Sequence, residues 1–295
     1  MLDEQKQKIL IAVDGSDQAL NAVRYVAAIM DPISTIAVLF NIENESPSWI
    51  RDVQDNPLYR VETSGAKQWS LNRKKIIRQF FDDAKLILSD AGFPQDNIRP
   101  VIHIKNVGIA SDILEESKNG YSAVVMGRSG ISKLKDLLFG SFAQNLIGKI
   151  KDIPLVIVGG KKFSRNIMIA YDPAVWTPNN VNCVGSLLKS CECKLKICHA
   201  VRSKVIDQAR ITRSMEEARN LLLRFGKPIA CVESEVISIK KGPAFDIIEA
   251  AIKENYDTIV VGRRGFLSYY QEQFGGRFSK KIMRRSNQMA VWILS

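Results

Sequence analysis

Features that define several protein classes are missing from this chain of 295 residues. No stretch approaches the roughly 18 consecutive apolar residues that a membrane span needs, so we expect no transmembrane segment. The start, MLDEQKQKILIAVDG, offers only the five apolar residues from Ile9 to Val13, which is too short for the apolar core of a secretory signal. These absences predict a cytoplasmic protein that does not enter a membrane.

The residues that usually carry catalysis or bind metals are also scarce. Only two histidines occur, His103 and His199, and both stand inside apolar strand patterns, where packed or edge-strand positions are expected. The phosphate-binding pattern G-x-x-x-x-G-K-[ST] and the nucleophile pattern G-x-S-x-G are both absent. No Asp, Glu, His or Cys cluster has metal-ligand spacing. We therefore assign no catalytic residue and no metal-ligating residue.

Cysteines are few, odd in number and free of any CxxC pair, which indicates neither a disulfide framework nor a zinc site. We interpret them as reduced thiols, most of them buried as small apolar residues. All five lie in the second half of the chain: Cys183, Cys191, Cys193, Cys198 and Cys231.

Charge is present but unevenly spread. The formal net charge is +11, yet residues 1–160 hold 19 basic and 19 acidic residues, whereas residues 161–295 hold 23 and 12. Such an uneven charge distribution gives information about binding partners rather than about the fold. Seven basic side chains cluster near one acid, Glu272: Arg263, Arg264, Arg277, Lys280, Lys281, Arg284 and Arg285. A solvated helix face and an anion-binding surface both explain the cluster. No nucleic-acid-binding motif is present, so nucleic acid is not the expected partner.

The chain repeats itself. Apolar runs end at Asp14 and Asp172, and a second pair of runs ends 28 residues later, at Ile42 and Ala200. The segments GIASDILEE and GPAFDIIEA share glycine, alanine, aspartate, isoleucine and glutamate in register. Glycines recur at matching intervals, at Gly92, Gly108, Gly127, Gly130 and Gly140 and again at Gly226, Gly242, Gly262, Gly265 and Gly275. We interpret this as a tandem duplication into two domains, residues 1–160 and 161–295.

The one large difference between the intervals lies between Ile42 and Gly92, where the first repeat carries about 24 additional residues. This segment is polar, holds two prolines and is predicted as a loop or broken helix. It contains Trp49, Tyr59 and Trp69, and we hypothesise that residues 43–70 form a lid over a ligand site in the first repeat.

Within each repeat, short β-branched runs alternate with amphipathic helical patterns. In the first repeat we predict strands at 8–13, 35–42, 98–104, 123–126 and 155–158, and helices at 16–30, 71–91, 109–118 and 142–150. Continuous apolar strands between amphipathic helices favour parallel strands covered on both faces. The predicted fold class is therefore α/β, with two tandem doubly wound parallel-sheet domains. Ligands bind such sheets beyond the carboxyl ends of the strands, where strand order reverses.

Two features of the first repeat suit anion binding at that edge. Asp14, Gly15 and Ser16 stand where the first strand gives way to a helix, whose N-terminus offers unpaired N–H groups. A second element is G-x-x-G, nine residues, then Gly-Ser, with members Gly127, Gly130, Gly140 and Ser141. Glycine lets backbone N–H groups approach an oxyanion closely. Helix capping and ordinary turns are the alternative explanations.

This pair of features resembles the universal stress protein family, in its ATP-binding branch with G-2x-G-9x-G-(S/T), and in tandem form. The resemblance implies a Rossmann-like, adenine nucleotide alpha hydrolase-like fold that binds ATP, with Mg²⁺ held chiefly by the phosphates and by Asp14. By the same resemblance, Asp14, Ile42 and Met126 frame the adenosine. Ribose and phosphates are assigned to Gly127, Gly130, Gly140, Ser141 and the backbone N–H of Phe142.

The second repeat keeps part of the pattern, at Asp172, Gly262, Gly265 and Gly275. It departs from the pattern at Gly276, where the family has Ser or Thr, and at Pro173, which lacks a backbone donor. We therefore expect the nucleotide mainly in the first repeat. The resemblance also implies that the repeats pack as an intramolecular pseudo-dimer that could pair again as a homodimer.

Three functions follow from these observations. The first is a cytosolic stress-response protein that binds ATP as a regulatory ligand and is not an enzyme. The second is a slow ATPase or nucleotide-dependent enzyme, against which stands the lack of an identifiable general base. The third is a polyanion-binding scaffold that uses the basic second domain, which a steep salt dependence would favour. We adopt the first.

Overall fold

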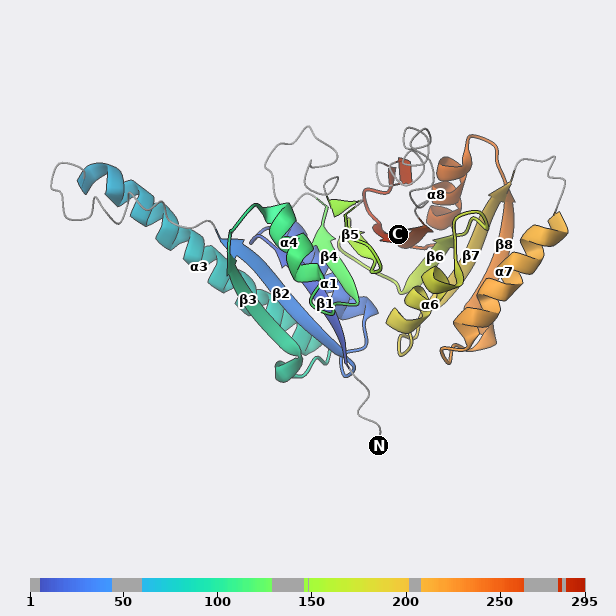
Figure 1. Cartoon of the computed structure of the whole chain (residues 1–295), viewed down its shortest axis with the longest axis horizontal. Coiled ribbons are helices and arrows are strands. Elements are labelled where there is room, and N and C mark those ends of the chain that lie inside the picture. The colour runs from blue at the N-terminus through green and yellow to red at the C-terminus, as the bar shows by residue number, and fades with distance from the viewer. Residues whose placement is uncertain are drawn as a thin grey trace.

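The structure is a computed structural model of the whole chain. It describes residues 6–43, 60–128, 146–147, 149–201, 208–262, 281–282 and 285–294, with the backbone alone for residues 60–70 and 229. In each half of the chain, a helix follows each of the first three strands (Figure 1).

The first half of the chain, from β1 to β5, contains five strands and three α-helices among the described residues. The strands are β1 (Gln7–Val13), β2 (Thr35–Glu43), β3 (Ile98–Ile104), β4 (Ala123–Gly127) and β5 (Leu155–Val158). The helices are α1 (Asp17–Ile29), α3 (Arg60–Asp90) and α4 (Ile109–Ser117), and a short 3₁₀ helix, η2 (Gln95–Asn97), precedes β3.

The second half, from β6 to β10, repeats this arrangement in its described residues. Its strands are β6 (Asn166–Ala170), β7 (Lys194–Val201), β8 (Val232–Ser238), β9 (Thr258–Gly262) and β10 (Ala290–Leu294). Its helices are α6 (Pro178–Leu187), α7 (Gln208–Leu223) and α8 (Pro243–Lys253), with the 3₁₀ helix η3 (Ile229–Cys231) before β8.

All ten strands join in one sheet, in the order β3-β2-β1-β4-β5-β10-β9-β6-β7-β8. Every described strand pairing is parallel except the central one, where β5 and β10 run antiparallel. The order is therefore symmetric. Counted inward from either edge, the third, second, first, fourth and fifth strands of one half follow one another. Strand order reverses between β1 and β4 and again between β6 and β9, which are the two places where a doubly wound sheet binds ligands.

Helices cover both faces of the sheet. The apolar residues of α1, α3, α6 and α7 pack with one set of inward-facing strand residues, and those of α4 and α8 pack with the opposite set. Each of these two clusters contains residues from both halves. The core is consequently continuous across the β5–β10 junction.

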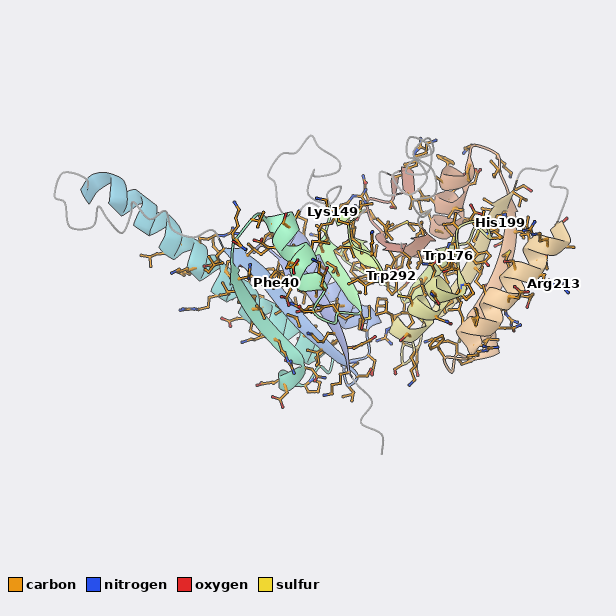
Figure 2. The ribbon with its side chains drawn as sticks, viewed as in Figure 1. Phe40, Lys149, Trp176, His199, Arg213 and Trp292 are labelled. Carbon is orange, nitrogen blue, oxygen red and sulfur yellow. The ribbon has the colours of Figure 1, made fainter. Side chains whose placement is uncertain are left out.

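A buried hydrogen-bonded group crosses that junction. The Trp292 Nε1–H donates to the Tyr25 hydroxyl at 2.6 Å, and Tyr25 Oη lies 3.1 Å from Thr258 Oγ1. Phe163 meets the Tyr25 ring edge-on, with 4.8 Å between ring centroids. Trp292 lies in the middle of the molecule in Figure 2, between the helices of the two halves. The two halves thus share polar as well as apolar contacts.

The predicted fold class is confirmed, and the predicted strands of the first repeat match the observed ones within one residue at each end. One expectation is wrong in part. The additional segment of the first repeat was expected to be a loop or broken helix, but residues 60–70 are the first turns of α3. Extending an existing helix adds one hydrogen bond per residue without a new nucleation step. These turns project beyond the sheet (Figure 1), so they need no apolar stripe to form.

Candidate functional site

The first candidate site begins at the turn that leaves β1. Gly15 has φ +83°, a left-handed conformation that glycine adopts without strain. Ser16 caps α1, since its Oγ accepts the Ala19 N–H at 3.2 Å. The Asp14 Oδ1 accepts both the Ser16 N–H at 3.1 Å and the Ser16 hydroxyl at 2.6 Å. Asp14 and Ser16 therefore hold each other at the helix start, as the capping alternative predicts.

Helix α3 closes one side of this turn. A Cβ on Gly15 would lie 3.0 Å from Ile77 Cδ1 and 3.2 Å from Ile76 Cγ2. Partial burial raises the pKa of Asp14, while its bonds to Ser16 and the positive charge of Arg73 act in the opposite direction. The Asp14 carboxylate is thus half-buried, next to a cation, at the carboxyl end of the sheet.

A buried acceptor without a partner lies beside this turn on β2. Asn41 is 1% exposed, and its Nδ2 donates to the Val13 carbonyl at 2.8 Å. Its Oδ1 accepts no hydrogen bond from any described residue. A buried polar atom in that state costs about 1–3 kcal/mol, which a bound donor group would remove. Ile42, the next residue, is half-buried and ends the apolar part of β2.

The end of β4 completes the described part of this site. Met126 is 4% exposed and belongs to the cluster on the α4 side. A Cβ on Gly127 would lie 2.3 Å from the Gln18 carbonyl oxygen of α1, so the first turn of α1 by itself requires glycine here. Close helix packing explains Gly127 without any ligand.

The residue after Gly127 links the two halves. The Arg128 N–H donates to the Val158 carbonyl at 3.0 Å, and its Nη1 donates to the Ser286 carbonyl at 2.9 Å. Burial lowers the pKa of the Arg128 guanidinium to about 10. Arg128 therefore connects the end of β4 to the segment before β10.

The structure brings together one part of the predicted first site. Asp14, Gly15 and Ser16 follow β1, Ile42 lies near the end of β2, and Met126 and Gly127 end β4, all at the carboxyl ends of neighbouring strands. The predicted phosphate-binding residues Gly130, Gly140, Ser141 and Phe142 lie outside the described residues, as do Gly265 and Gly275 of the second repeat.

The second half has a different structure at the corresponding corner, by which we mean the turn from β6 into α6 together with the end of β9. Helix α6 is capped by Thr177, five residues after Asp172, whereas Ser16 follows Asp14 by two. The longer loop places Trp176 in the corner, where its Nε1–H donates to the Ala170 carbonyl at 3.0 Å. A Cβ on Gly262 would lie 2.9 Å from the same indole nitrogen. The Trp176 ring, 6% exposed, thus covers the end of β9.

Position 199 corresponds to position 41, because each stands 27 residues after its aspartate. The His199 Nδ1 lies 2.7 Å from the Tyr171 carbonyl, just as Asn41 bonds to Val13. Both histidines are at the positions the sequence predicts: His199 in β7, and His103, part-buried, on the edge strand β3. Figure 2 shows Trp176 and His199 on the second half.

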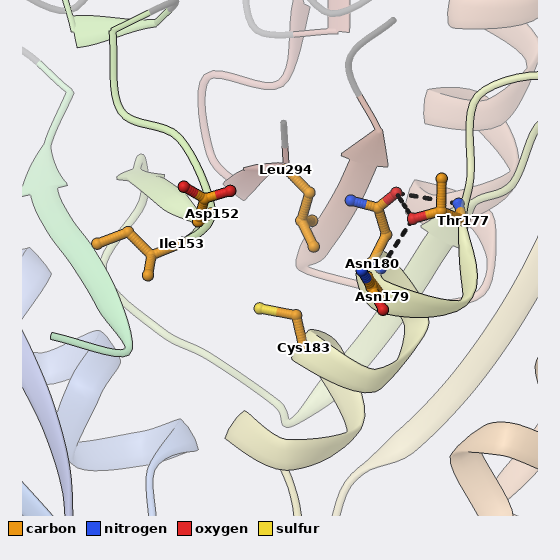
Figure 3. Close-up of a pocket in the computed structure, with 7 residues that line it drawn as sticks. All are labelled: Asp152, Ile153, Thr177, Asn179, Asn180, Cys183 and Leu294. Atoms are coloured by element: carbon orange, nitrogen blue, oxygen red, sulfur yellow. Dashed lines mark hydrogen bonds between the residues drawn. The ribbon is translucent and has the colours of Figure 1, made fainter. Parts of the chain in front are cut away.

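A small hollow lies between the halves, next to the start of α6 (Figure 3). Its volume is about 260 Å³, and its lining consists of Asp152, Ile153, Thr177, Asn179, Asn180, Cys183 and Leu294. The Thr177 and Asn180 side chains bond to each other at 2.9 Å in the capping box of α6. The lining includes an acid and no base, which disfavours a polyphosphate.

Sequence reasoning missed three residues of these sites. Asn41 and Arg73 gave no signal, because a single polar residue in a strand and one cation in a helix fit many roles. Trp176 could have been noticed as a large aromatic residue in the polar loop DPAVWTP. Of the basic cluster, the structure describes Lys281 and Arg285, and the Arg285 guanidinium lies 5.1 Å from the Phe245 ring centroid.

Metal clusters and membrane-spanning helices are both absent from the described residues. No group of three or more His, Cys, Asp or Glu side chains among them could hold a metal ion. In the same part of the chain, no helix combines the length and the apolar character that crossing a bilayer requires.

Comparisons with known proteins bear on this site. The sequence profile of the universal stress protein family matches residues 6–159, which include the whole described first site. No curated protein sequence matches the chain.

Solved structures of similar length share the fold. A universal stress protein from Archaeoglobus fulgidus DSM 4304 superposes with a TM-score of 0.65 at 19% identity, covering 99% of both chains. A protein of unknown function from Pseudomonas aeruginosa PAO1 gives 0.55 at 14% identity, covering 99% of this chain and 93% of its own. At these identities the likeness concerns the fold alone.

Proposed function

The chain belongs to the universal stress protein family, and we propose that its first half binds an adenine nucleotide, ATP, as a regulatory ligand in a stress response. The observation that carries the proposal is the unsatisfied, buried Asn41 Oδ1 at the carboxyl edge of the sheet. Adenine presents N–H donors, and the resemblance assigns the adjacent main chain at Ile42 to the adenosine. The site thus offers an acceptor where the ligand offers a donor.

The neighbouring residues fit the rest of such a ligand. The half-buried carboxylate of Asp14 accepts ribose hydroxyls or assists a Mg²⁺ ion carried by the phosphates. The motif of Gly130, Gly140 and Ser141 supplies the backbone and hydroxyl donors for the phosphates, as the resemblance implies. A bound magnesium nucleotide would contribute charge and shape for recognition, and the chain's own residues would orient it at the β1–β4 reversal.

We propose one nucleotide per chain. Trp176 fills the equivalent corner of the second half, covers Gly262 and keeps any ligand away from the end of β9. The β5–β10 pairing supports the view that the two halves are an intramolecular pseudo-dimer, of which the first half binds and the second half stabilises. We place the boundary between the two halves at residues 160–161, in the segment between β5 and β6.

The proposal predicts that Asn41→Leu weakens ATP binding by about tenfold or more, because one buried hydrogen bond of about 1.4 kcal/mol is lost. Asp14→Ala and Gly140→Val should abolish binding while the fold survives. Isothermal titration calorimetry with ATP, ADP and AMP measures affinity and stoichiometry, and thermal melting confirms folding. Mass spectrometry of undialysed protein identifies any nucleotide that copurifies.

The matched control is His199→Leu, which removes the corresponding side chain of the second half and should leave the affinity unchanged. Equal affinity in Asn41→Leu, or two nucleotides per chain, would contradict the proposal. Phosphate release from the same samples distinguishes binding from turnover. Steady release with many turnovers per chain would favour the enzyme alternative instead.

A further inference from the structure

A second cluster of reactive groups lies at the opposite edge of the sheet, in the second half. Cys191 and Cys193 stand in the turn between α6 and β7, and Lys227 stands in the turn between α7 and η3. These turns precede strands β7 and β8, so the cluster is at the amino ends of the strands. It is separate from the proposed nucleotide site, which is at the carboxyl ends.

The turn holds the two thiols together. The Cys193 N–H donates to the Cys191 carbonyl at 2.9 Å, which folds the three residues Cys-Glu-Cys tightly. The Cys191 thiol hydrogen-bonds to the Cys193 sulfur. Both side chains are buried, with 7% of Cys191 and 3% of Cys193 exposed. The two sulfurs are therefore hydrogen-bonded neighbours in one tight turn.

A buried cation faces this pair. Lys227 is 7% exposed, and its Nζ donates to the Cys191 carbonyl and to the Cys193 sulfur. Among the residues that the structure describes, no carboxylate pairs with Lys227. A buried ammonium without a counter-charge is costly, so a negative sulfur is the group that balances it.

The other ionisable groups near the pair include Glu192, the exposed residue between the two cysteines, Arg165, whose charge acts on Cys191, and Tyr25 of the first half. The hydrogen bond from Cys191, followed by the charge of Lys227, lowers the pKa of Cys193 to about 7, although burial opposes this shift. The pKa of Cys191 is raised, chiefly by the hydrogen bond to Cys193 and by burial. One sulfur is thus poised as a nucleophile and the other as a protonated partner.

We propose that Cys191 and Cys193 are a redox-active thiol pair that hydrogen peroxide converts into a disulfide, with Lys227 as the activating residue. The Cys193 thiolate attacks one peroxide oxygen, the O–O bond breaks, and the released hydroxide takes a proton to become water, leaving a sulfenic acid. The Cys191 sulfur then attacks Cys193, the S–O bond breaks, and a second water leaves with the thiol proton. Two thiols lose two electrons, and one peroxide becomes two waters.

The wild-type protein tests this directly. The full chain is treated with hydrogen peroxide at pH 7, remaining thiols are alkylated, and an unreduced tryptic digest is analysed by mass spectrometry. Trypsin releases both cysteines in one peptide, Ser190–Lys194, without any other cysteine. We expect that peptide to lose two hydrogen atoms first and to regain them with dithiothreitol. Cys198 is an internal control, since it is buried like the pair but burial raises its pKa to about 12.

Variants test the role of the lysine. Lys227→Met should slow disulfide formation at pH 7 by about tenfold, because a higher pKa of Cys193 leaves less thiolate. Lys227→Arg retains the charge and should react at close to the wild-type rate. In Cys191→Ser, dimedone should trap a sulfenic acid at Cys193, whereas Cys193→Ser should leave Cys191 reduced.

Two results would overturn the proposal. One is a wild-type peptide 190–194 that keeps both thiols while Cys231 or Cys198 is oxidised. The other is a folded Lys227→Met protein, verified by circular dichroism, that forms the disulfide at the wild-type rate. The wild-type digest decides the question even where a variant does not fold.

Discussion

At the scale of single residues, both halves have an aspartate at the same position of the repeat, and its role is structural. Asp112 accepts the backbone N–H groups of Asn106, Val107 and Gly108 at 2.9, 3.1 and 3.4 Å. Asp246 does the same in the second half for Lys240, Lys241 and Gly242. Burial by itself would raise the pKa of Asp112, but these backbone donors lower it. A residue repeated in register therefore needs no ligand to explain it.

We expect Asp112→Asn to destabilise the protein by about 1–3 kcal/mol near pH 7, because an amide has one acceptor oxygen and no charge. The folded pKa is below the ordinary value, so the contribution is complete above about pH 4 and is lost as the pH falls through the folded pKa. Urea unfolding of both proteins from pH 7 to pH 2.5 measures the difference.

The control for this prediction is Asp96→Asn, which changes an exposed aspartate of the same half. It should leave stability within about 0.5 kcal/mol of wild type. A constant difference between Asp112→Asn and wild type across the whole pH range would show that charge is not the cause.

At the scale of elements, α3 determines the shape of the first site. Its residues 60–70 continue a helix that packs on the sheet further along, where Ile77 is 1% exposed. Ile77 also contacts the position above Gly15, so the helix supports the turn that carries Asp14. In the second half, α6 starts later after its aspartate, and the Trp176 side chain occupies the position next to the end of β9. Equivalent strands of the two halves are thus followed by two different arrangements of loop and helix.

We expect Ile77→Ala to destabilise the protein by about 2–4 kcal/mol, because it leaves a cavity between α3 and the sheet. It should also weaken nucleotide binding, since the Asp14 turn loses its support. Leu86→Ala is the matched control, because Leu86 lies in the same helix, is 62% exposed and does not contact the Gly15 position, so its loss should cost less than about 1 kcal/mol. Thermal melting and calorimetry check both effects, and equal losses in the two variants would contradict this role of α3.

At the scale of the whole molecule, the two halves form one sheet and share both apolar clusters. The Arg165 Nε donates to the Ala28 carbonyl at 2.7 Å, and Arg128 reaches Ser286 in the opposite direction. We therefore expect the halves to unfold as one cooperative unit, because neither can expose the junction alone without losing buried area and hydrogen bonds.

We expect Tyr25→Phe to lower the stability of the whole chain by about 1–3 kcal/mol, since Trp292 Nε1–H loses its acceptor in a buried setting. Calorimetry should show one transition, shifted as a unit, with both halves unfolding together. Tyr121→Phe is the control, because its hydroxyl bonds to Glu116 within the first half. Two separate transitions in Tyr25→Phe would show that the halves are independent.

Much of the fold could be read from the sequence, because the signals are local. Apolar runs of strand length, amphipathic helices and matched glycine intervals depend on neighbours along the chain, and they predicted the α/β fold and the strands of the first half. Asp14, Gly15 and Ser16 fall where predicted, since the end of a strand and the start of a helix are written in consecutive residues. The family resemblance rests on the same local pattern.

Tertiary structure decided what depends on residues far apart in sequence. That Gly127 is needed for close packing with Gln18, that Asn41 keeps a buried acceptor, and that Trp176 fills the second corner all follow from contacts between separate elements. The same is true of Lys227 beside Cys193, and of β10 beside β5. Periodicity determines which face of an element is buried, but only the assembled sheet determines which side chain meets it there.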